Sequence, residues 1–122
     1  MIITREYLRA NPTHIFVFGD NMLHSGYAGA AALRDEPNVF KFITKKRPTQ
    51  EDSAFYTPEE YKKIYLREIG LLIVDIQMQP DNLFLISKLG SGLANRFGIF
   101  EAIIEPHIKN DLASYSNVKF LW

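Results

Sequence analysis

Short apolar runs alternate with segments of helical periodicity along this chain. Three of the runs, Ile15–Phe18, Val39–Thr44 and Leu83–Ser87, are rich in aromatic or branched aliphatic residues and predict strands. A closing strand is expected at Asn117–Leu121. Because strand, loop and helix alternate throughout, the pattern predicts a three-layer α/β domain spanning residues 1–122, with a mostly parallel sheet and helices on both faces.

The helical segments carry clear start and stop signals. Pro58–Gln77 repeats apolar residues at spacings of three and four, and Thr57 is placed to cap its first turn. A short helix is expected at Arg5–Ala10. A last amphipathic helix is expected beyond Gly98, where Pro106 kinks or divides it. We interpret the apolar faces of these helices as core that covers the sheet.

The first strand is followed by polar and glycine residues that suit a binding loop. We expect the strand to stop at Gly19, with Asp20 and Asn21 in a turn. A helix over Ala28–Arg34 follows directly. Parallel α/β sheets bind ligands beyond the carboxyl ends of their strands, where free helical N–H groups and the helix dipole favour anions. The sequence therefore predicts an anion-binding crevice at this loop.

A second glycine loop, residues 88–95, follows the strand at Leu83–Ser87. In a parallel sheet both loops open on the same edge, so together they predict a site that holds a phosphate or pyrophosphate. The polar segment Lys45–Ser53 is expected to form an exposed loop. The basic residues at its start either add positive charge to this edge or are solvated at the surface without a role in binding. The alternative is that both loops only supply tight turns. The candidate ligand-binding residues are Gly19, His24, Gly26, Gly29, Thr44, Lys45, Lys88, Gly90, Ser91, Gly92 and Leu93.

Composition excludes several classes of function. Fourteen basic and fourteen acidic side chains cancel, so no overall charge draws the chain to nucleic acid or an acidic membrane. The absence of cysteine excludes disulfides and thiol catalysis, and His14, His24 and His107 show no metal-ligand spacing. No Rossmann or P-loop signature occurs, and we expect no cofactor. Without a membrane span or signal peptide, a cytoplasmic location is expected, with the oligomeric state left open.

Several motifs carry a resemblance to a known family. They are F-V-F-G-D-N, G-Y-A-G-A-A, L-R-D-E-P-N, T-K-K-R-P and L-G-S-G-L-A. Between about Ile15 and Leu93 the chain resembles a family of small uncharacterised bacterial and phage proteins, and more distantly it is similar to the macrodomains that bind ADP-ribose. This resemblance implies that Asn21 meets the distal ribose, that Gly26 and Gly29 approach it and the neighbouring phosphate, and that residues 90–94 enclose the diphosphate.

Two functions of different class are consistent with these features. The first is binding of a phosphorylated nucleoside, such as ADP-ribose or an NAD-derived metabolite. Any hydrolysis would use Asp20 as base, while Asn21 orients the sugar and a water. The second is a phage or bacterial accessory protein that binds a host protein, in the host cytoplasm if phage-encoded. An exposed patch with Phe55, Tyr56 or Trp122 would favour it, as would loops too tight for a ligand.

Overall fold

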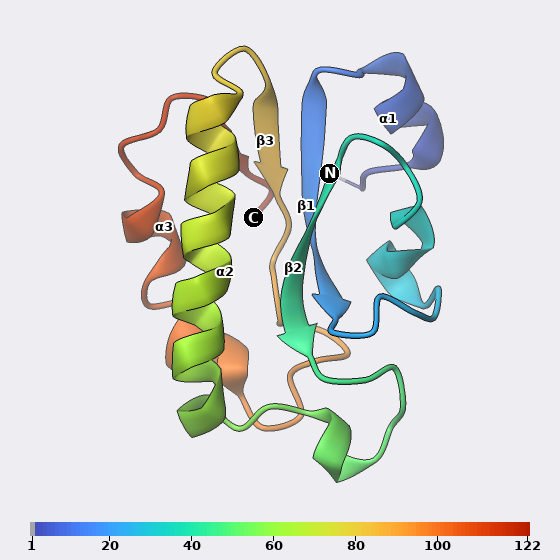
Figure 1. The fold of residues 1–122 in the computed structure, drawn as a ribbon, viewed down its shortest axis with the longest axis vertical. Helices are drawn as coiled ribbons and strands as arrows, with labels where there is room; N and C mark the ends of the chain where they lie inside the picture. The colour runs from blue at the N-terminus through green and yellow to red at the C-terminus, as the bar shows by residue number, and fades with distance from the viewer. Residues whose placement is uncertain (1) are drawn as a thin grey trace.

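A four-stranded, fully parallel sheet forms the centre of the computed structural model, which describes residues 2–122 (Figure 1). The strand order is β2-β1-β3-β4. The strands are β1 (His14–Asn21), β2 (Val39–Lys45), β3 (Leu83–Ile86) and β4 (Val118–Phe120). The predicted α/β fold is confirmed, and the sheet is parallel throughout.

Helices cover both faces of this sheet (Figure 1). The longest is α2 (Pro58–Met78), which begins with the predicted capping box between Thr57 and Glu60. Thr4 caps α1 (Arg5–Ala10) by accepting a hydrogen bond from the Tyr7 N–H. The shorter helices are η1 (Gly29–Leu33), η2 (Asp52–Ala54), η3 (Phe100–Ile104) and α3 (Ile108–Asp111).

Alternating side chains of the strands build two apolar cores. Val17 faces the larger core, which lies under α2, η3 and α3. Phe16 and Phe18 face the smaller core, where Leu8 of α1 and Leu33 of η1 pack. Burial on both faces is the arrangement expected of a parallel sheet and explains the continuous apolar runs in the sequence.

The order in which the chain adds strands to the sheet reverses at β1. β2 lies on one side of β1, and β3 and then β4 lie on the other. The β1–β2 connection contains η1, whereas the β2–β3 connection contains α2, which covers the opposite face (Figure 1). The connection that leaves β1 and the connection that enters β3 therefore lie on opposite faces of the sheet. Open α/β sheets place their ligand crevice at such a switch point.

Two predicted boundaries need correction, and one predicted break is confirmed. β1 does not stop at Gly19 but continues to Asn21, because its last residues pair with β2. The predicted helix over Ala28–Arg34 is a five-residue 3₁₀-helix, η1, over Gly29–Leu33. The last amphipathic segment is divided at Pro106, which is one of the two predicted outcomes: η3 is a π-helical turn, and α3 begins only after Pro106, which lacks the N–H that a continuous helix needs.

Candidate functional site

A cavity of about 410 Å³ opens at the carboxyl ends of β1, β2 and β3. Its walls come from the loop after β1, the end of β2, the segment that follows β2 and the loop after β3. His24 does not line it, but all the other predicted site residues do. These are Gly19, Asp20, Asn21, Gly26, Gly29, Thr44, Lys45, Lys88, Gly90, Ser91, Gly92 and Leu93. The fold thus brings both glycine loops to one cavity.

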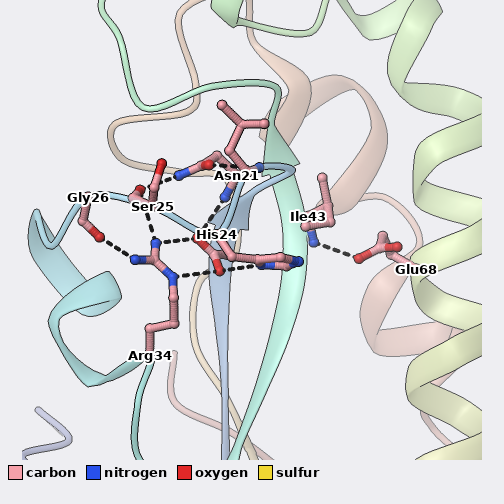
Figure 2. Close-up of polar contacts among 9 residues, drawn as sticks. Asn21, His24, Ser25, Gly26, Arg34, Ile43 and Glu68 are labelled. Carbon is pink, nitrogen blue, oxygen red and sulfur yellow. Dashed lines mark hydrogen bonds and ion pairs between the residues drawn. The ribbon is translucent and has the colours of Figure 1, made fainter.

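Arg34 ties the first loop to the end of β1 (Figure 2). Its Nε lies 3.0 Å and its Nη2 2.5 Å from the two carboxylate oxygens of Asp20, whose side chain is fully buried. The same guanidinium donates hydrogen bonds to the carbonyl oxygens of Gly26 and Ser25. Sequence reasoning assigned Arg34 no role, although an arginine that ends the apolar run A-A-A-L was a signal.

The carboxylate of Asp20 is held ionised by its partners. The Asn21 N–H donates to one carboxylate oxygen at 2.8 Å, and Nδ1 of His24 lies 2.9 Å from the other. Burial raises the pKa of Asp20, but the hydrogen bonds from Arg34, His24 and the Asn21 backbone outweigh burial and leave this pKa below its ordinary value. A carboxylate with a lowered pKa and engaged oxygens is a poor proton acceptor.

Asn21 closes the turn that follows β1. Its amide Nδ2 donates to the Ser25 carbonyl at 2.8 Å, and its Oδ1 accepts from the Leu23 N–H at 3.0 Å (Figure 2). Both polar ends of the side chain are therefore used within the loop. The preference of asparagine for such local backbone bonds explains its place here.

A bulge at the end of β2 brings Thr44 against Gly19. The register skips Thr44, since Asp20 pairs with Ile43 and the following pair is Asn21 with Lys45. A Cβ on Gly19 would lie 2.9 Å from Thr44 Oγ1, so the close approach requires glycine.

On the other side of β2, the buried Glu68 of α2 accepts the Ile43 N–H at 2.7 Å (Figure 2). Sequence reasoning missed Glu68, whose place among the apolar positions of α2 was the available signal.

Lys45 has a mostly buried side chain whose ammonium reaches solvent and has no counter-charge in the described chain. The segment after β2 folds back on the strand end through a bridge between Lys45 and Phe55, so Lys45 is only 8% exposed and not in an open loop. Its Nζ lies 4.4 Å from the Phe55 ring centroid, and no hydrogen bond or ion pair joins it to any described residue. Burial and the nearby charge of Arg96 lower the pKa of Lys45. The two basic residues that follow are paired, Lys46 with Glu60 and Arg47 with Glu51.

Several backbone N–H groups in both loops have no hydrogen-bond partner in the described chain. Within residues 2–122, no hydrogen bond is donated by the N–H groups of residues 26–30, 90 or 92–94. Because η1 is a 3₁₀-helix of five residues, the predicted contribution of a helix dipole is not available. Loop N–H groups, Lys45 and the exposed Lys88 are what this cavity offers an anion.

We expect Gly90→Ala to destabilise the protein by about 1–3 kcal/mol. Gly90 has φ +75°, and a Cβ there would lie 2.7 Å from Cδ1 of Ile104. Both the left-handed backbone and the contact with the core oppose a side chain. Urea unfolding measures the effect, and a variant as stable as the wild type would contradict this placement of the second loop.

The described residues offer neither a metal site built on acidic, histidine or cysteine side chains nor a membrane-spanning helix. Across residues 2–122, no three His, Cys, Asp or Glu side chains are grouped to hold a metal ion. In the same part of the chain, no helix combines the length and the apolar character needed to cross a membrane.

Comparison with known proteins identifies a family whose function is unknown. Residues 1–86 match the profile of a family of unknown function, DUF7831. No match was found among curated proteins or solved structures. The matched residues include β1, the first loop, β2, α2 and β3, while the second glycine loop lies beyond them.

Proposed function

The chain belongs to the DUF7831 family, and we propose that its cavity binds a phosphorylated nucleoside such as ADP-ribose or an NAD-derived metabolite. The observation that carries this proposal is Lys45: the residue is only 8% exposed, its ammonium reaches solvent at the cavity wall, and it has no acidic partner in the described chain. A cation held at a cavity wall without a counter-charge from the protein is free to pair with an anionic ligand.

The backbone around Lys45 supports an anionic ligand. The N–H groups of residues 26–30 and of the second loop donate no hydrogen bond within the described chain. Successive N–H groups of this kind form concavities that bind phosphate. Hydrogen bonds to a charged group contribute about 1.5–3 kcal/mol each, so a few of them together with Lys45 suffice for specific binding.

The size of the cavity favours a small molecule over a lone anion. Its volume of about 410 Å³ lies within the range of small-molecule sites. Serine hydroxyls and glycine backbone on its walls suit sugar and phosphate groups. The resemblance of the two loops to those of macrodomains points to the same class of ligand.

The geometry favours binding over hydrolysis. Asp20 would be a weak base because its carboxylate is buried and bonded to Arg34. Asn21 uses one donor of its Nδ2 and one lone pair of its Oδ1 to hold the loop, so its side chain is fixed by the turn that it closes. We assign both residues to shaping the cavity.

A host-protein partner has less support. Phe55 and Tyr56 are 2% and 5% exposed, and Trp122 is partly buried, so they form no open patch. The run at residues 45–47 is also no free basic surface, because two of its three cations are paired. One feature favours a protein partner: α2 exposes large apolar side chains at Leu66, Leu71, Val74 and Met78.

A thermal-shift screen with ADP-ribose, NAD, cyclic ADP-ribose isomers, nucleotides and ribose phosphates tests the proposal. Ligand at about 100 times its dissociation constant would stabilise the fold by about 2.7 kcal/mol, a shift of several degrees. We expect Gly92→Val to abolish the shift while preserving the fold, because Gly92 lines the cavity and a Cβ there meets no atom within 4 Å.

Gly70→Ala is the matched control. Gly70 lies on the exposed side of α2, and a Cβ there also meets no atom within 4 Å. This variant should gain up to about 1 kcal/mol of stability and keep the ligand shift. The absence of a shift with every compound would reject the proposal and direct the search to partners of α2.

A further inference from the structure

A second cavity, of about 590 Å³, lies beside the first. Four residues line both: Gly29 and Ala30 of η1, and Ser87 and Lys88 after β3. The two cavities are therefore separated only by the start of η1 and the end of β3. A ligand longer than one cavity would pass between these two elements.

The two cavities differ in chemistry. The side chains found only in the second are all apolar, and the largest are those of Ile2, Ile3, Phe16, Leu33, Leu121 and Trp122. The first offers Lys45 and unpaired backbone N–H groups, and Lys88 adds a second positive charge at the boundary that the two cavities share. A ligand that fills both must carry an anionic group at one end and an apolar, flat or bulky group at the other.

Two of the four boundary residues, Ser87 and Lys88, have polar side chains, and the Ser87 hydroxyl is free. Ser87 is partly buried, and no hydrogen bond joins its hydroxyl to any described residue. Its backbone N–H is fixed by the Val17 carbonyl at 3.1 Å, so the end of β3 holds its position. A hydroxyl that can both donate and accept suits a sugar hydroxyl at the middle of such a ligand.

We propose that the second cavity is the nucleobase subsite, so that one ligand places its phosphates at Lys45, its ribose at Ser87 and its base among the apolar side chains. This inference rests on the proposed function, since it assigns the two ends of the same nucleotide. Burial of the base in an apolar cavity adds affinity that compounds without a base lack.

Calorimetric titration with ADP-ribose, ribose 5-phosphate and pyrophosphate tests the subsite. Ala32→Phe fills only the second cavity, because Ala32 lines it and not the first. We expect this variant to lose about tenfold or more in affinity for ADP-ribose while its affinity for the two compounds without a base stays unchanged. Ala102→Phe, at an exposed alanine of η3, is the matched control and should bind all three like the wild type.

The boundary residue gives a separate readout. Ser87→Ala should weaken the two ribose compounds about 2- to 10-fold and leave pyrophosphate unchanged. An Ala32→Phe variant that is folded by thermal melting and binds ADP-ribose like the wild type would overturn the base subsite alone. If the wild type binds none of the three compounds, the proposed function fails, and the subsite fails with it.

Discussion

Arg34→Met will cost about 3–5 kcal/mol of unfolding free energy, the largest loss we expect from a polar substitution in this chain. The change removes the arginine partner of Asp20 and leaves its buried carboxylate with only His24 and the Asn21 N–H as partners. It also removes the donors that hold the carbonyls of Ser25 and Gly26, so the first loop loses its attachment to β1. Urea unfolding with a two-state fit measures the loss.

The effect is specific to the buried pair. Adding Asp20→Asn to Arg34→Met removes the unpaired charge and should recover part of the lost stability, which a double-mutant cycle measures. Arg47→Met is the matched control: its partner Glu51 lies 3.5 Å away and is exposed, so a loss of no more than about 1 kcal/mol is expected. An equal loss in both arginine variants would contradict the assigned role of Arg34.

The same pair predicts a pH dependence. The pKa of Asp20 is lowered in the folded protein, so its ionised form contributes stability above the unfolded value of 3.8. This contribution is lost as the pH falls through the lower folded pKa. In acid titrations followed by circular dichroism, Arg34→Met should therefore unfold at a higher pH than the wild type.

Lys45→Met will weaken binding of ADP-ribose roughly 10- to 100-fold without destabilising the protein. The variant loses the charged contact to phosphate, but it breaks no side-chain hydrogen bond or ion pair within the described chain, and the ammonium that it removes is solvent-accessible. Methionine keeps the contact with Phe55 because sulfur packs well on aromatic rings. Titration calorimetry and urea unfolding on the same sample separate the two effects.

Lys46→Met is the matched control for this binding defect. Lys46 is paired with Glu60 and does not line the cavity, so its loss should leave affinity unchanged. In the wild type, the lowered pKa of Lys45 predicts that affinity falls as the pH rises through that pKa, because only the protonated amine attracts phosphate. Unchanged affinity in Lys45→Met would remove the observation on which the proposed function rests.

Local sequence signals determined most of the fold. The apolar runs located all four strands, and the Thr57 capping box located the start of α2. The alternation of strand, loop and helix indicated a parallel sheet, and a parallel sheet in turn placed both glycine loops on one edge. These features depend on residues close in sequence, and therefore periodicity, capping and turn preferences were enough to predict them.

Only the tertiary structure decided the roles of the polar residues at that edge. Asp20 was expected in a turn, but pairing with β2 makes it the end of a strand, and Arg34, fourteen residues away, occupies its carboxylate. Lys45 was expected on an exposed loop, but Phe55 returns to cover it and leaves its ammonium at the cavity wall. Contacts between distant residues set burial, and burial decides whether a charged side chain is a base, a structural partner or an unpaired site for a ligand.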